Sequence, residues 1–185
     1  MITVIEQIAR QPGLTHLGGE DRAALASCLR RRGLRRGEIL FREGDVGDSL
    51  FFLEYGAVRL LTRDASRVQQ TLTELPAGEL LGEMACIDPA ARSATAVAIH
   101  DSAALTLSRD GLYAMRAHCP TPARAVFALA ARSLARRLGE THARIIERIG
   151  GPRRASSGVI PRADAPEAPR PLSQRVAGWF GRGGA

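Results

Sequence analysis

Residues 82–97 read GEMACIDPAARSATAV, and this stretch is the most specific in the chain. A glycine and a carboxylate, Gly82 and Glu83, begin a short segment of small and apolar residues, and Arg92 follows nine residues after the carboxylate. Such residues suit a phosphate and an adjacent sugar hydroxyl, because an arginine bonds a phosphate through two N–H groups at once.

A cyclic phosphodiester keeps its negative charge near neutral pH, so a buried one needs a charged partner and several donors. Arg92 supplies the charge, and Ser93 adds a hydroxyl donor. Gly82 permits close backbone approach, and the amides of Met84 and Ala85 are free of competing polar side chains at the start of a helical turn.

Glu83 needs a donor, because a carboxylate directed at a phosphate would repel it. That donor is a ribose 2′-hydroxyl, the Arg92 guanidinium, or both. As a bare pair, a Glu and an Arg nine residues apart indicate a structural salt bridge more often than a ligand site. The preceding glycine, the small residues between the pair and the β-rich segment upstream favour the ligand site.

Six short apolar clusters separated by Gly, Asp and Pro predict the fold class between residues 37 and 107. These clusters are EILF, SLFFLEY, AVRLLTR, VQQTLTEL, ATAVAIH and AALTLS. Strands at such regular spacing predict an antiparallel β-roll or jelly roll. With helices on both sides of it, the fold class is α+β and mainly β.

Helical periodicity flanks this β-rich segment. Residues 2–10 and 20–32 are amphipathic, and Gly33 is a stop signal for the second. Residues 109–117 predict a short helix and 123–149 a long one. The expected organisation is an N-terminal helical segment (1–33), the β-roll (34–108), the C-terminal helices (109–149) and a disordered tail rich in proline, glycine and arginine (150–185).

Residues 82–97 resemble the phosphate-binding cassette of cyclic nucleotide-binding domains, the family of bacterial catabolite activator protein, kinase regulatory subunits and cyclic-nucleotide-gated channels. The run FREGDVGDSLFFLEYGAV, residues 41–58, resembles the first glycine-punctuated hairpin of that family. The order of helices, β-roll and helices also fits. The resemblance covers roughly residues 14–145 and is closest to a stand-alone bacterial type.

The resemblance implies that Glu83 binds the ribose 2′-hydroxyl and that Arg92 binds the cyclic phosphate. The remaining ligand-binding residues that it implies are Gly82, Met84, Ala85, Ser93 and Ala94. Gly44, Gly47 and Gly56 match turn glycines of the family. Two positions depart from it, since Ala91 stands where proline is frequent and Cys86 where leucine is usual.

The ligand implied is cAMP or cGMP, with no metal. Ser93 does not separate the two, because a hydroxyl after the arginine occurs in binders of both; we favour cAMP as the commoner bacterial ligand. The purine cap comes from the C-terminal helix in this family, and Arg132, Leu134 and Arg136 are its candidates.

The function expected is a cyclic-nucleotide-binding regulatory module rather than an enzyme, because the four histidines are scattered and no nucleophile or paired carboxylates accompany them. The module would signal to an unidentified effector protein by ligand-induced movement of its C-terminal helices. Two alternatives are a cyclic-nucleotide-responsive transcription regulator without a recognisable DNA-binding domain and a degenerate, non-binding interaction domain.

Composition narrows the partners and the location. More than half of the net charge of +7 lies in the tail, which contains six arginines and only two acidic residues, Asp164 and Glu167. Because DNA-binding domains usually concentrate basic residues on a folded face, DNA is not an expected partner. Three isolated cysteines, and no signal peptide or membrane-length apolar run, predict a cytoplasmic protein without a membrane span. The apolar face of 123–149 either packs on its own β-roll or forms a homodimer.

Overall fold

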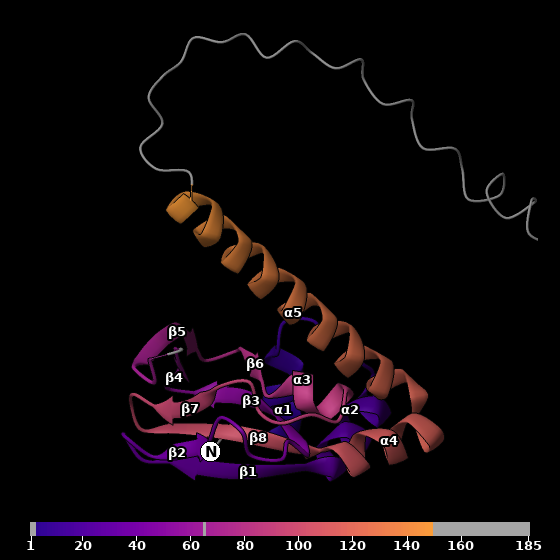
Figure 1. The fold of residues 1–185 in the computed structure, drawn as a ribbon. Coiled ribbons are helices and arrows are strands. Elements are labelled where there is room, and N and C mark those ends of the chain that lie inside the picture. Colours follow the sequence, from indigo (N-terminus) through magenta and orange to yellow (C-terminus); the bar gives the residue numbers. More distant parts are fainter. Residues whose placement is uncertain (1–2, 65, 150–185) are drawn as a thin grey trace, which may run out of the picture. The chain divides into compact units, whose positions relative to one another are not determined.

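The computed structural model describes residues 3–64 and 66–149, and two β-sheets carry its architecture (Figure 1). The elements are α1 (Val4–Arg10), α2 (Gly19–Cys28), β1 (Leu29–Leu34), β2 (Ile39–Phe41), β3 (Ser49–Tyr55), β4 (Ala57–Arg63), β5 (Gln69–Pro76), β6 (Leu80–Leu81), α3 (Glu83–Ile87), β7 (Thr95–Ala98), β8 (Ser102–Ser108), α4 (Arg109–His118) and α5 (Pro120–Ile149).

Every paired strand is antiparallel, which confirms the expected β-roll. One sheet has the order β1-β8-β3-β6 and the other β2-β7-β4-β5. Leucines and alanines that point inward from both sheets form one core, in which Leu53, Val58 and Leu81 are fully buried. The alternation of half-buried and buried positions in β7 is that of a strand with one face on the core.

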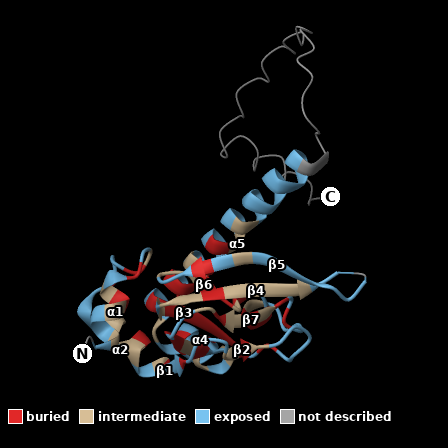
Figure 2. Ribbon diagram, turned by 90° about the vertical axis from the view of Figure 1, so that its left-hand side faces the viewer, coloured by how far each residue is buried: buried red, intermediate tan, exposed pale blue. Residues whose placement is uncertain are grey.

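A second core lies between the first sheet and the helices. Leu25 of α2 and Leu112 of α4 are fully buried there, together with Leu50 and Leu107 of the sheet. Figure 2 shows buried residues along the first half of α5 and exposed residues along its C-terminal half. The helices before and after the β-roll therefore share one apolar layer.

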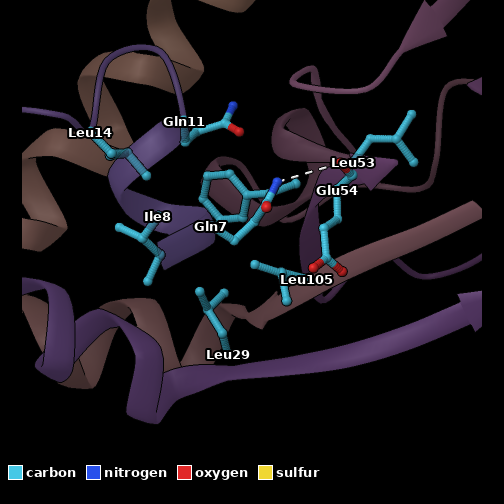
Figure 3. A pocket seen from close by; sticks show the side chains of 9 residues that line it. Gln7, Ile8, Gln11, Leu14, Leu29, Leu53, Glu54 and Leu105 are labelled. Atoms are coloured by element: carbon cyan, nitrogen blue, oxygen red, sulfur yellow. Dashed lines mark hydrogen bonds between the residues drawn. The ribbon is translucent and has the colours of Figure 1, made fainter. Parts of the chain in front are cut away.

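The N-terminal helix α1 packs on the same apolar layer (Figure 3). Its Ile8 is buried, and the side-chain amides of Gln7 and Gln11 donate to the carbonyl oxygens of Glu54 and Gly78 at 3.4 and 2.6 Å. The cavity left under the helix measures only about 10 Å³. Because that volume holds at most one water, α1 is a structural cover.

The helix predicted for residues 20–32 is too long. It ends at Cys28, and Leu29–Leu34 form strand β1. Leu29 and Leu34 are buried at the two ends of this strand and pair with Leu107 and Ser102 of β8. Pairing along the sheet outweighs the helix propensity of the three arginines between them, and their charges suit an exposed edge strand.

The six predicted strands are all confirmed, as are both C-terminal helices. The two-residue strand β6 was not predicted, because two leucines are too short a run to show the alternation of a strand. Residues up to Ile145 form one compact unit, and the end of α5 is the described part of a second. The predicted disordered tail, 150–185, lies outside the described residues.

Candidate ligand-binding site

The candidate site begins at Gly82, the residue that joins β6 to α3. Its φ of 75° lies in the left-handed region, which favours glycine. A Cβ at this position would stand 2.6 Å from Nη1 of Arg92 and 3.2 Å from the carbonyl oxygen of Ser49. Glycine is therefore required both for the turn and for the close approach of Arg92.

The loop between β2 and β3 holds the cassette from the other side. The backbone amide of Arg92 donates to the backbone carbonyl of Asp45 at 2.8 Å, and the amide of Gly44 donates to the carbonyl of Arg92 at 2.9 Å. A Cβ on Gly47 would lie 2.1 Å from the Cβ of Ala85. The two segments that resemble the family, 41–58 and 82–97, are far apart in sequence but are thus packed directly against each other.

Arg92 is 5 % exposed and has no acidic partner among the ion pairs of the described residues. Nη1 donates to the carbonyl of Gly82 at 2.8 Å, and Nη2 to Oγ of Ser49 at 3.2 Å. The guanidinium lies 4.4 Å from the centre of the Phe41 ring, and its Nε is buried without a hydrogen-bond partner. Burial lowers the pKa of Arg92, with Asp48 opposing part of the shift.

Glu83, the first residue of α3, is 1 % exposed. Its Oε1 accepts from Nη1 of Arg137 on α5 at 3.0 Å, while its Oε2 is buried with no partner. Burial raises the pKa of Glu83, and the nearby Arg137 opposes the shift. The ion pair between Glu83 and Arg92, one of the alternatives left open by the sequence, is not formed among the described residues, and Arg137 is the partner of Glu83.

Both charged groups face one cavity of about 40 Å³. The cavity is lined by all seven predicted ligand-binding residues, Gly82, Glu83, Met84, Ala85, Arg92, Ser93 and Ala94, and by three that were not predicted, Phe41, Leu60 and Arg137. Leu60 stands two residues after the buried Val58 on β4, so strand periodicity points to it. Periodicity does not point to Phe41, because the buried position of β2 is its neighbour Leu40. Arg137 is one of several arginines on α5, and periodicity does not single it out.

The three residues considered for the purine cap do not line this cavity. Arg136 instead forms ion pairs with Glu79 and, at 2.9 Å, with Glu140. Arg137 also donates to the carbonyl of Leu80, and Nη1 of Arg144 donates to the carbonyl of Leu72 at 2.7 Å. Polar contacts from successive turns of α5 thus hold this helix over β5 and β6.

Cys86, the departure from leucine, is fully buried, and burial raises the pKa of its thiol. It therefore fills space as a small apolar residue. Ala91 lies on the exposed loop before Arg92, where it bridges to Val46. Within residues 3–64 and 66–149 no group of His, Cys, Asp or Glu side chains could hold a metal ion, and no helix is long and apolar enough to cross a membrane.

Comparison with known proteins agrees with this geometry. Residues 31–119 match the cyclic nucleotide-binding domain. The cyclic AMP receptor protein of Thermus thermophilus is 36 % identical over 118 residues, which are 64 % of this chain and 55 % of that protein. A cAMP-dependent protein kinase regulatory subunit of Eremothecium gossypii is 33 % identical over 100 residues, 54 % of this chain and 21 % of the subunit.

Among solved structures, a cyclic nucleotide-binding domain from Methylobacillus flagellatus superposes with a TM-score of 0.71. It is 27 % identical, and the match covers 85 % of each chain. The chain spans about half the length of the Thermus receptor and less of the kinase subunit. On its sequence, its β-roll and its cassette, the chain belongs to the cyclic nucleotide-binding domain family.

Proposed function

We propose that this chain is a regulatory module that binds cAMP, with Arg92 on the cyclic phosphate and Glu83 on the ribose 2′-hydroxyl. One observation carries the proposal: a buried arginine without a carboxylate partner and a buried carboxylate with a free oxygen line the same cavity. Buried charges are costly unless they are paired, so an unpaired one at a cavity suggests a ligand of opposite charge.

The phosphate would complete the bonding of Arg92. Its Nε has no acceptor, and its guanidinium carbon lies 4.4 Å from the centre of the Phe41 ring and 5.6 Å from that of the Phe51 ring. The amides of Gly82, Met84 and Ala85, the hydroxyl of Ser93 and the backbone of Ala94 complete the proposed phosphate shell. Charge-assisted hydrogen bonds of this kind are roughly twice as strong as neutral ones.

The ribose would use the free oxygen of Glu83. A 2′-hydroxyl is a donor, and Oε2 is a buried acceptor without one. Because Oε1 already accepts from Arg137, the carboxylate can serve the sugar and α5 at the same time. A deoxyribose ligand would leave Oε2 unsatisfied, so the site should prefer ribose.

cAMP is the proposed ligand because the names of the receptor and the kinase subunit refer to cAMP. Ser93 is exposed, and its hydroxyl lies 3.8 Å from the sulfur of Met84, a contact that does not distinguish the purines. Leu60 and Phe41 line the cavity with apolar side chains, which offer no hydrogen bond that would select one base.

The output would pass through α5. The cavity of about 40 Å³ is far below the roughly 300–1,000 Å³ of typical ligand pockets, and Arg137 forms one of its walls. Entry of a nucleotide would therefore require α5 to shift, while the long side chain of Arg137 keeps its ion pair with Glu83. The receiving partner is an effector protein, recognised through this helix.

Isothermal titration of the chain with cAMP, cGMP and cyclic di-GMP tests the proposal. We expect saturable binding of cAMP and no binding of cyclic di-GMP, and the cGMP titration measures how far the site discriminates between the two purines. 2′-Deoxy-cAMP is the matched probe for Glu83 and should bind about tenfold more weakly, since one hydrogen bond to a charged group is lost. Failure of all three cyclic nucleotides to bind at millimolar concentration would support the non-binding interaction domain instead.

A further inference from the structure

The carboxyl end of α3 is bonded to α4 by two side chains that do not line the cavity. Arg109 donates from Nε to the carbonyl of Cys86 at 3.2 Å and from Nη2 to the carbonyl of Ala85. The hydroxyl of Tyr113 donates to the carbonyl of Ile87 at 3.3 Å. Three successive carbonyls of α3 thus accept from two residues that stand one turn apart on α4.

Arg109 also reaches the loop that holds the cassette. Its Nη2 donates to the carbonyl of Gly47, and its backbone amide donates to the backbone carbonyl of Asp48 at 2.6 Å. Gly47 in turn lies against Ala85, where a Cβ would be only 2.1 Å away. One guanidinium therefore joins the loop, α3 and the beginning of α4.

The contacts continue from α4 to α5. The ring of Tyr113 meets the ring of Phe127 edge to face, with centroids 6.3 Å apart and planes at 81°. Ala85 lines the cavity at one end of this series, and Phe127 lies in α5 at the other. Every step between them is a direct contact.

We propose that Arg109 and Tyr113 are positioning residues that transmit a ligand-induced shift of α3 to α4 and α5. This inference rests on the proposed function and assigns its transmission to particular side chains. α3 has only five residues, so its carbonyls move together. If α3 moves and α4 does not follow, the three hydrogen bonds break, two of them from a charged donor. If α3 and α4 move together, these hydrogen bonds are kept and the movement costs less free energy.

Hydrogen exchange of the full chain, with and without saturating cAMP, tests this. The variants are Arg109→Met and Tyr113→Phe, singly and combined. Arg124→Met, an exposed arginine of α5, is the control. In the wild type and the control we expect cAMP to change the exchange of amides in 109–130. In each single variant this change should fall by about half, and in the double variant it should vanish.

The affinity of each variant for cAMP shows whether a substitution impairs the transmission of the shift or destroys the binding site. Arg92 and Glu83 are intact in every variant, so cAMP should still bind, about tenfold more weakly in Arg109→Met and within about threefold of wild type in Tyr113→Phe. Tyr113→Phe removes one hydroxyl and keeps the ring, so the test stands even if Arg109→Met does not fold.

Two results would overturn the inference alone. One is a saturated double variant whose 109–130 amides respond to cAMP as in the wild type. The other is a wild type that binds cAMP with no change in those amides. A wild type that binds no cyclic nucleotide would overturn the proposed function, and the inference with it.

Discussion

At the scale of single residues, the site holds two opposite charges that do not neutralise each other. Glu83 pairs with Arg137, and Arg92 is left with carbonyl and hydroxyl acceptors only. A structural ion pair between Glu83 and Arg92 would satisfy both charges without a ligand. The observed arrangement keeps one arginine available for an anion, and this leads to two predictions.

Arg92→Met should separate binding from stability. The variant fills the same space, and the fold loses a desolvated cation that has no carboxylate partner. The urea midpoint should therefore stay close to that of the wild type or rise, whereas cAMP affinity should fall by at least about 100-fold. A loss of stability of several kcal/mol at unchanged affinity would make Arg92 a structural residue.

Glu83→Gln should change how stability depends on pH. Burial raises the pKa of Glu83 above its ordinary value of 4.5, so the folded state binds more protons than the unfolded state between these two values. The unfolding free energy of the wild type then falls as pH rises through this window, with a slope of about 1.4 kcal/mol per pH unit. The glutamine does not titrate.

The measurement is urea unfolding of both proteins from pH 4.5 to 8. The unfolding free energy of the variant minus that of the wild type should increase with pH and level off above the raised pKa. Comparison of the two proteins removes the contribution of other carboxyl groups, such as Glu38, whose pKa is lowered by a hydrogen bond from the Arg35 amide. A constant difference would contradict the prediction.

At the scale of elements, α5 is held to the β-roll near the site by arginines rather than by an apolar seam. Arg136, Arg137 and Arg144 donate to carboxylates and carbonyls of residues 72–83. Arg137 is 18 % exposed in its side chain, and its partner Glu83 is buried; Arg136 and its partners are much more accessible. The two neighbouring arginines should therefore differ in energetic weight.

Arg137→Met should cost about 3 kcal/mol of unfolding free energy at pH 7, because it leaves Glu83 buried and unpaired. Arg136→Met is the matched control, and its loss should stay within about 1 kcal/mol, as for exposed ion pairs. The double variant Glu83→Gln, Arg137→Met should recover part of the loss. Urea unfolding measures all three, and equal losses for the two arginines would refute the distinction.

At the scale of the whole molecule, α5 also carries apolar side chains that face away from the core. Leu138 and Ile145 are 72 % and 48 % exposed and stand seven residues apart, which places them on one face of the helix. If the chain forms the homodimer that the amphipathic pattern of 123–149 left open as one alternative, a second copy would cover this face.

Sedimentation equilibrium should then give twice the mass of one chain at micromolar concentration. Leu138→Glu with Ile145→Glu should give the mass of a monomer and leave cAMP affinity within about threefold, since both residues lie outside the cavity. A monomeric wild type at these concentrations would contradict the homodimer.

The sequence by itself determined the β-roll and the long C-terminal helix, and the seven residues that it proposed for the ligand line one cavity, while their role in binding stays a prediction. These depend on local rules: the period of a strand, the left-handed turn at Gly82 and a motif of sixteen consecutive residues. What it did not determine depends on distant partners. Leu29–Leu34 are a strand because β8 lies beside them, although their arginines suit a helix.

Only the tertiary structure decided which arginine meets Glu83. Arg92 and Arg137 carry the same group, and the nearer in sequence was the natural choice. Packing places Arg137 at the carboxylate and surrounds Arg92 with Phe41, Gly82 and Ser49. Since helical periodicity fixes a face but not how far along the roll each turn of α5 docks, this partner depends on the assembled fold.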